Sequence, residues 1–281
     1  MTSDQSLLEL IKQALDEGKI ELPVFDNIAV KIHREARANE LNADGICKIL
    51  EADPVLVTEV LRMSNSTFFS GLAEVKDLRA AAVRLGVKQL ASIVMSVSQK
   101  RMYSASKGPF KGRMVNLWLH SSAVSMASRW IASQAGYTQL ADEAFVAGLL
   151  HDVGKLSLFR IIEELHKEHA IPLTNELVDM TIQQLYCPHG AELIERWKLP
   201  QSFAQLILHQ ADEELDESNV NMMIVRLADK ATALEGISDF PDSTITLETL
   251  PETTALGLSD IDIAELRILL EDLAGPSAQA A

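Results

Sequence analysis

Apolar residues recur three or four positions apart through nearly all of the 281-residue chain, which is the spacing of one face of an α-helix. No run of alternating β-branched residues is long enough to predict a sheet. The pattern therefore predicts an all-α fold. In the N-terminal part, the predicted helices are residues 5–17, the segment carrying Ile28 and Ile32, the segment carrying Ile46 and Leu50, a short helix from Pro54, and residues 78–85 and 87–97.

Residues with a side-chain oxygen precede three of these helical patterns, at Asn42, Asp53 and Asp77. Such side chains accept hydrogen bonds from the free N–H groups of the first helical turn, so we expect them to be N-caps. Pro54, directly after Asp53, suits the first turn of a helix. Gly18 and Gly86 are predicted to end helices, and Asn65-Ser66 is predicted to form a turn.

Residues 103–112 change in composition to Ser, Lys, Gly and Pro, which predicts a joint between an N-terminal bundle and the rest of the chain. Beyond it, the predicted helices are residues 117–133, 142–150, 156–168 and 175–185, then His189 to Trp197, a helix capped by Ser202 that reaches His209, and residues 220–234 and 261–273. An acidic, Thr-rich segment separates the last two.

Composition narrows the class of protein. The formal net charge is −15 and the pI is about 4.9, so the overall field repels phosphate backbones and argues against direct binding of nucleic acid. No apolar run reaches the length of about 18 residues that a membrane span needs. The first residues lack the basic start and apolar block of a signal peptide, which predicts a cytoplasmic protein. Cys47 and Cys187 form no CxxC pair, so neither a disulfide framework nor a thiolate zinc site is expected.

The run of residues 145–159, FVAGLLHDVGKLSLF, places His151, Asp152 and Lys155 in a stretch that otherwise reads as core. Burying these groups without partners would cost several kcal/mol. Two arrangements could satisfy them: a divalent metal completed by His or Asp from other helices, or a closed hydrogen-bond network among the same residues.

Candidate metal ligands lie along the predicted C-terminal helices, at His120, His151, Asp152, His189, His209 and Asp229. Imidazole and carboxylate ligands suit iron, manganese, nickel or zinc, and helical bundles build metal sites from side chains of several helices. Adjacent helical residues point about 100° apart, so His151 and Asp152 can share one ion only where a helix ends. Gly154, two residues later, suits such an ending.

The order His120, His151-Asp152, Asp229 resembles the HD superfamily of metal-dependent phosphohydrolases. The sequence His151-Asp-Val-Gly-Lys155 and the additional His189 and His209 are closer to the HD-GYP subgroup, which hydrolyses cyclic dinucleotides. The chain departs from that subgroup in two ways: His209-Gln210-Ala211 replaces its His-His-Glu run, and the Gly-Tyr-Pro motif is missing.

The N-terminal half resembles the HDOD domain, the HD-related output domain of bacterial signalling proteins. The resemblance rests on Leu22-Pro23, Asp53-Pro-Val-Leu56, the segment from Leu61 to Ser66 and the segment from Ala80 to Gly86. The runs GLLHDVGKL and HGAELIERWKLP in the C-terminal half also belong to the pattern, which covers residues 20–235. It implies an N-terminal helical subdomain, residues 1–105, packed on an HD-like helical subdomain, residues 113–236. Residues 237–281 would add an acidic segment and a C-terminal helix.

Two functions follow from the resemblance. The first is a regulatory output protein without catalysis, which binds signalling proteins through its N-terminal subdomain, near Asn65 and Ser66, and joins its pathway by non-covalent contact. The second is a metal-dependent phosphohydrolase acting on a nucleotide or cyclic dinucleotide, in which Lys155 would neutralise charge on the phosphate. A nucleic-acid regulator built on the helix pair within residues 42–65 is a third hypothesis, which the acidic charge disfavours.

Overall fold

The computed structural model describes residues 6–17, 22–69, 74–104, 108–169 and 173–275. Within these ranges every regular element is helical, which confirms the predicted all-α class. The elements are α1 (Leu7–Asp16), α2 (Asn27–Arg37), α3 (Ala43–Leu50), α4 (Pro54–Ser64), α5 (Leu78–Leu85), α6 (Val87–Ser104), α7 (Lys111–Gln134), η1 (Thr138–Leu140), α8 (Ala141–Leu150), α9 (Val153–His169), α10 (Asn175–Arg196), α11 (Gln201–His209), α12 (Val220–Leu234), η2 (Leu247–Thr249), α13 (Pro251–Ala255) and α14 (Asp260–Ala274).

The predicted helix starts of the N-terminal half are confirmed. The side chains of Asn42, Asp53 and Asp77 accept hydrogen bonds from backbone N–H groups three residues later, at 2.8, 2.9 and 2.7 Å. Gly86 follows α5 with φ of 81°, a conformation that favours glycine, and α6 begins at the next residue. The predicted helix end at Gly18 lies outside the described residues. Local side-chain chemistry therefore sets these boundaries.

Two helices are longer than their apolar pattern predicted. Helix α6 extends to Ser104 rather than residue 97, because the polar Gln99 is buried and its Nε2 donates to the carbonyl of Leu149 at 2.7 Å. Helix α10 is continuous across Pro188, where two helices were predicted. A proline removes one helical hydrogen bond, but buried residues before it, such as Ile182, and after it, such as Leu193, hold α10 in one helix.

Two helix starts also differ from the prediction. Helix α7 begins at Lys111 rather than at residue 117. The prediction missed this start because the first residues of the helix are mostly polar and carry little apolar signal. Helix α11 begins at Gln201, so Ser202 is not its cap; Pro200 takes the N-cap position without a side-chain hydrogen bond. In both cases the helix begins earlier than the apolar periodicity does.

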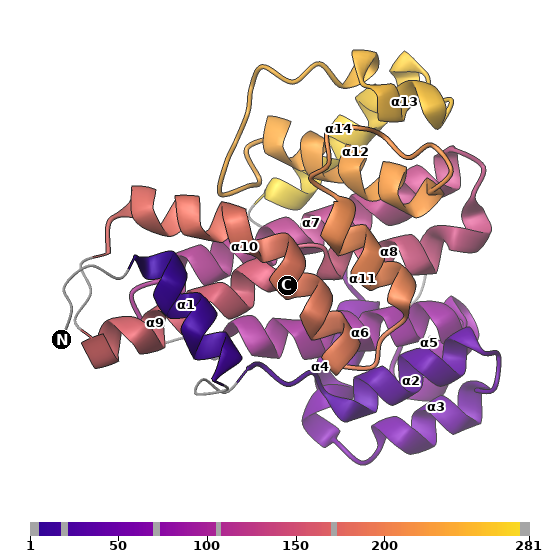
Figure 1. Ribbon diagram of the computed structural model, residues 1–281. Helices are drawn as coiled ribbons and strands as arrows, with labels where there is room; N and C mark the ends of the chain where they lie inside the picture. Colours follow the sequence, from indigo (N-terminus) through magenta and orange to yellow (C-terminus); the bar gives the residue numbers. More distant parts are fainter. Residues whose placement is uncertain (1–5, 18–21, 70–73, 105–107, 170–172, 276–281) are drawn as a thin grey trace.

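The helices gather into groups around α6 and α7 (Figure 1). Helices α2 to α5 lie together at the lower right, and α12 to α14 lie at the top. Helix α1 lies apart from α2, against α9 and α10. One continuous set of buried apolar side chains runs through all of these groups, from Leu7 to Leu270. The division of the chain at residues 106–112 and 237 stays a prediction.

The predicted turn at Asn65-Ser66 is present, because α4 ends at Ser64. The Asn65 side chain brackets Val75: its Nδ2 donates to the Val75 carbonyl at 2.8 Å and its Oδ1 accepts from the Val75 N–H at 2.8 Å. Asn65 therefore holds the chain on both sides of residues 70–73. Both polar atoms of the Asn65 side chain therefore make hydrogen bonds within the protein.

Across the described part of the chain, no single helix has both the length and the apolarity to cross a membrane. Only α5 and α6 taken together would pass by length and composition, and they are bent by 120° with respect to each other.

Candidate functional site

His151 and Asp152 lie in a break between two helices. Helix α8 ends at Leu150 and α9 begins at Val153, which confirms that the pair stands at a helix end. Gly154 has a different role from the one expected, because a Cβ atom there would lie 2.0 Å from the backbone oxygen of Tyr186 on α10. Glycine at this position lets the first turn of α9 rest on the backbone of α10 and fixes the direction of the break.

The imidazole rings of His120 and His151 are each oriented by a backbone carbonyl. His120 Nδ1 lies 2.8 Å from the oxygen of Ile237, and His151 Nδ1 lies 2.7 Å from the oxygen of Gly148. A carbonyl oxygen only accepts, so we assign the hydrogen to Nδ1 in both rings. The two Nε2 atoms then face each other at 3.2 Å.

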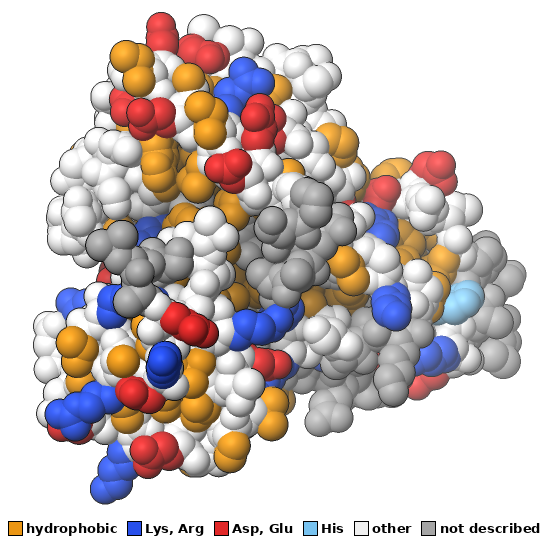
Figure 2. Space-filling model, turned by 180° about the vertical axis from the view of Figure 1, so that it is seen from behind, with side chains coloured by type: hydrophobic (Ala, Val, Ile, Leu, Met, Phe, Trp, Pro, Cys, Tyr) orange, Lys and Arg blue, Asp and Glu red, His pale blue; other side chains and the backbone are white. Residues whose placement is uncertain are grey.

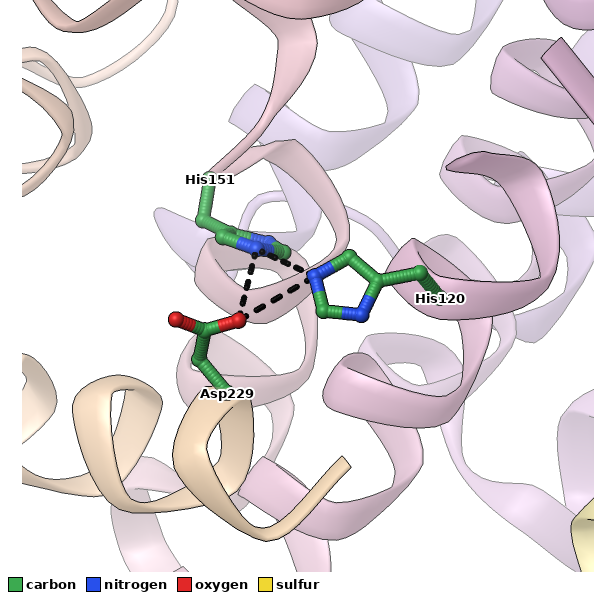
Figure 3. Close-up of side chains that lie close together, drawn as sticks. All are labelled: His120, His151 and Asp229. Carbon is green, nitrogen blue, oxygen red and sulfur yellow. Dashed lines mark hydrogen bonds and ion pairs between the residues drawn. The ribbon is translucent and has the colours of Figure 1, made fainter. Parts of the chain in front are cut away.

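Two carboxylates approach the Nε2 atoms of His120 and His151. Asp229 on α12 places Oδ1 3.1 Å from His120 Nε2 and 3.8 Å from His151 Nε2. Figure 3 shows His120, His151 and Asp229 converging from α7, from the break between α8 and α9, and from α12. Asp152 Oδ2 lies 3.4 and 3.3 Å from the same two nitrogens. His120, His151 and Asp152 are almost completely buried, whereas the Asp229 side chain is 48% exposed.

Lys155 brings the positive charge of the cluster. Its Nζ donates to Asp152 Oδ2 at 2.7 Å and lies 4.7 Å from the ring centre of Tyr186. Burial disfavours the ammonium, but the Asp152 and Asp229 charges outweigh it and raise the pKa of Lys155. Burial likewise opposes the Asp152 carboxylate, yet the electrostatic attraction of the His151 ring and the Lys155 ammonium holds its pKa well below the usual range. Asp152 and Lys155 are therefore a charged pair at neutral pH.

His120 responds most strongly to the two carboxylates. Burial disfavours the imidazolium, but hydrogen bonds to Asp152 and Asp229 outweigh this effect and raise the pKa of His120 to about 10. The hydrogen bond with His120 also outweighs burial at Asp229 and lowers the pKa of that carboxyl. Without a metal, a proton on His120 therefore satisfies the cluster.

The same donor set fits a divalent cation. One ligand atom each from His120, His151 and Asp229 lies within 4.8 Å of the others, and Asp152 adds a carboxylate oxygen beside them. Both Nε2 lone pairs point to the shared centre because Nδ1 is bound to a carbonyl, which is the usual outer support of metal-binding histidines. Nitrogen and oxygen ligands of this kind suit the iron, manganese, nickel or zinc expected from the sequence.

The other two predicted ligands are not brought to this centre. His189 Nε2 lies 2.8 Å from Ser157 Oγ, and burial lowers the pKa of His189 to about 4. His209, at the end of α11, is exposed and its Nδ1 pairs with Asp212 Oδ2 at 2.9 Å. The structure thus assembles His120, His151, Asp152, Asp229 and Lys155, and gives His189 and His209 different partners.

Several supporting groups could not be recognised in the sequence. The carbonyls of Ile237 and Gly148 orient the rings, but backbone atoms leave no residue signature. Gln210 Nε2 donates to the carbonyl of His151 at 2.8 Å. Its only sequence signal is that it stands directly after His209, where the HD-GYP pattern has a second histidine.

Comparisons with known proteins agree with this architecture. A family profile described as "HDOD domain" matches residues 22–213. A solved HDOD domain protein of unknown function from Geobacter sulfurreducens superposes with a TM-score of 0.75 at 24% identity, covering 95% of this chain and 93% of that one. A protein from Shewanella amazonensis, named "Putative metal-dependent phosphohydrolase", superposes with a TM-score of 0.72 at 19% identity, covering 98% of both chains.

A third structure, named "Putative signal transduction protein", comes from Marinobacter aquaeolei. It has a TM-score of 0.66 at 19% identity, and the match covers 99% of this chain and 60% of that one. A curated, uncharacterized protein from Treponema pallidum is 23% identical over 189 residues, which is 64% of this chain. The match spans only 36% of that relative's length. At these identities, the structural likeness establishes the fold alone.

Proposed function

The chain belongs to the HDOD domain family, and on that premise we propose that it is a regulatory output protein of bacterial signal transduction that acts through protein partners rather than by catalysis. The observation that carries this proposal is the arrangement of the histidines. His120 and His151 share one compact centre with Asp152 and Asp229, whereas His189 pairs with Ser157. One centre of this kind suits a structural junction better than a two-metal hydrolase.

The centre joins parts of the chain that are far apart in sequence. His120 belongs to α7, His151 and Asp152 lie between α8 and α9, and Asp229 belongs to α12. A cation held there would bind these helices together, and its loss would leave the carboxylates to His120 and Lys155 alone. Such a centre can bias the relative positions of helices, which is how ligand switches act. Its occupancy would then adjust the affinity for a partner, whereas the binding surface itself lies on the N-terminal subdomain.

The metal-dependent phosphohydrolase is the second candidate, and the exposure of Asp229 favours it. With 48% of its side chain exposed, Asp229 gives the centre a face that a phosphate could reach. His120, His151, Asp152 and Asp229 would hold the metal, which supplies Lewis-acid activation of water when bound. Lys155 would neutralise charge on a nucleotide or cyclic dinucleotide, but it would first have to leave Asp152.

Partner binding and turnover can be separated by experiment. We expect purified protein reconstituted with manganese or iron to leave cyclic dinucleotides and nucleotide phosphates unchanged. We also expect affinity purification to recover a partner whose binding survives Asp152→Ala. Val83 on α5 is 74% exposed, so Val83→Asp probes the N-terminal face without disturbing the core. Val115→Asp on α7, at a side chain that is 50% exposed, is the matched control.

Loss of the partner with Val83→Asp but not with Val115→Asp would support binding through the N-terminal subdomain. Hydrolysis of a cyclic dinucleotide to its linear form, or release of phosphate from a nucleotide, that requires the metal and disappears in Asp152→Ala would overturn the non-catalytic proposal in favour of the hydrolase.

A further inference from the structure

A cleft of about 300 Å³ lies next to the His120 centre. Its walls come from the end of α4 and the turn after it, from α7, and from residues 236–238 with the end of α14. Figure 2 shows this side of the molecule hollowed between the C-terminal helices above and the N-terminal helices below, with hydrophobic side chains in the hollow. The cleft therefore lies where three distant parts of the chain meet.

The walls are mainly apolar with a few polar atoms. Met63, Phe68, Trp118, Leu119 and Met126 supply large apolar surfaces. Ser66 also lines the cleft, and its Oγ is buried without a hydrogen-bond partner among the described residues. Apolar walls with a few polar groups that fix orientation are the usual composition of small-molecule sites.

The size of the cleft favours a small molecule over a protein segment. Small-molecule sites begin at about 300 Å³. One turn of helix with side chains, about 10 Å across and 5.4 Å long, occupies roughly 400 Å³ and would not fit. The charge also fits a neutral occupant, because among the described residues that line the cleft Asp272 is the one acidic residue and none is a lysine or arginine.

The cleft and the His120 centre share a wall. Ile237 lines the cleft, and its carbonyl is the oxygen that orients His120 through Nδ1 at 2.8 Å. Leu119, the residue before His120 on α7, also lines the cleft. Gly236, with φ of 74°, sets the turn that brings Ile237 to this position. A molecule that moves Ile237 would therefore change the hydrogen bond that fixes the His120 ring.

We propose that this cleft binds a small, uncharged, mainly apolar molecule with a hydrogen-bonding group for Ser66, and that its occupancy is coupled to the His120 centre through Ile237. The coupling rests on the proposed function, since the molecule would be the input of a regulatory protein. Binding itself does not rest on it, so the two can be tested separately.

The binding test uses N-phenyl-1-naphthylamine, an uncharged apolar fluorophore with one N–H group. We expect saturable binding at one site of the full chain. Ser122→Phe places a ring in the cleft and should weaken binding at least tenfold, whereas Ser133→Phe, on the same helix but outside the cleft, should stay within twofold. Equal affinity of the two variants, or no saturable binding by the wild type, would overturn the proposal.

Two further variants test whether weaker binding comes from misfolding and whether the C-terminal end of the chain fills the cleft. Ser66→Ala is a small change that removes the unpaired hydroxyl and should weaken binding about two- to tenfold, the range of one hydrogen bond. Unchanged affinity would argue against the proposed site. A chain ending at Gly275 should bind like the full chain; a tenfold gain in affinity would mean that the protein's own end fills the cleft, which overturns the proposal.

Coupling is tested through its reciprocity. If His120 and the cleft are linked by Ile237, His120→Ala should change the probe affinity several-fold, because the carbonyl loses its donor. His189→Ala removes another buried histidine, one that is not among the described residues lining the cleft, and should leave the affinity within twofold. Equal affinities in both variants and the wild type would refute the coupling. These binding constants stay informative even if no protein partner exists.

Discussion

The Nε2 atoms of His120 and His151 lie 3.2 Å apart, and in both rings the Nδ1 hydrogen is already given to a backbone carbonyl. Two neutral imidazoles in these tautomers would place two lone pairs against each other. A cation must therefore lie between them, either a proton on one ring or a metal that both rings bind. The carboxylates of Asp152 and Asp229 next to the pair strengthen this demand for positive charge.

The first prediction is that the protein holds a metal at this centre. Elemental analysis of anaerobically purified protein should find near-stoichiometric iron, manganese, nickel or zinc. The double variant His151→Ala, Asp152→Ala should lose it, because it removes two of the four ligands. His189→Ala is the matched control and should retain the metal, since His189 pairs with Ser157. Absence of metal from the wild type, even after reconstitution, would leave a proton-held network.

The second prediction concerns the metal-free protein at alkaline pH. The pKa of His120 is raised to about 10 from an ordinary value near 6.5, so its proton stabilises the fold fully below pH 6.5. That stabilisation is lost as the pH rises towards 10. After chelation, the free energy of unfolding should therefore fall between pH 6.5 and 10 in the wild type, and His120→Gln should remove this slope.

His189→Gln is the control for that titration. Burial lowers the pKa of His189 to about 4, so the ring is neutral in the folded and unfolded chain above pH 6.5. Its replacement should leave the alkaline slope unchanged. The same slope in the wild type and in His120→Gln would show that another group titrates.

The third prediction compares two lysines of α9 that pair with an acid three residues earlier. Lys155 is 15% exposed and bonds to the buried Asp152, whereas Lys167 is 61% exposed and bonds to Glu164 at 3.1 Å. Lys155→Met leaves a buried carboxylate without its strongest partner and should lower the free energy of unfolding by about 3 kcal/mol. Lys167→Met should change it by less than about 1 kcal/mol. Denaturant unfolding of both variants measures the difference, and equal effects would contradict a buried pair.

The fourth prediction concerns the contact of α9 with α10. In Gly154→Ala the new Cβ would lie 2.0 Å from the Tyr186 backbone oxygen, and backbone atoms cannot move aside as a flexible side chain could. We expect a loss of about 3 kcal/mol in unfolding free energy, together with loss of metal from the displaced His151 and Asp152. Gly112→Ala, in α7 with nothing within 4 Å, should be neutral or stabilising by up to about 1 kcal/mol.

Local chemistry made much of the fold predictable. Asn42, Asp53 and Asp77 act within one helical turn, so their effect can be read without knowledge of the rest of the chain. The end of α6 was missed because the buried Gln99 donates from Nε2 to the Leu149 carbonyl, fifty residues away. Continuity across Pro188 depends in the same way on packing against other helices. Tertiary contacts, rather than local preferences, decided these boundaries.

The candidate site was likewise predictable in its residue types but not in its packing. The order of His120, His151, Asp152 and Asp229 is a sequence pattern, and the fold does bring these residues together. His209 shares that pattern by residue type, but it lies on the exposed end of α11 and pairs with Asp212. Residue type indicates which groups can bind a metal. Which of them face one another depends on helix packing, such as the contact that Gly154 allows.

The last prediction separates folding from partner binding at Asn65, which the sequence had suggested as a contact point. Because its amide makes two hydrogen bonds of 2.8 Å to the Val75 backbone, Asn65→Ala should lower the unfolding free energy by about 2 kcal/mol. Asn116→Ala, at an exposed position on α7, should change it by less than about 0.5 kcal/mol. Thermal unfolding of both variants makes the comparison. A fully stable Asn65→Ala protein that no longer binds its partner would instead make Asn65 an interface residue. The expected loss of stability means that partner mapping should use exposed positions such as Val83.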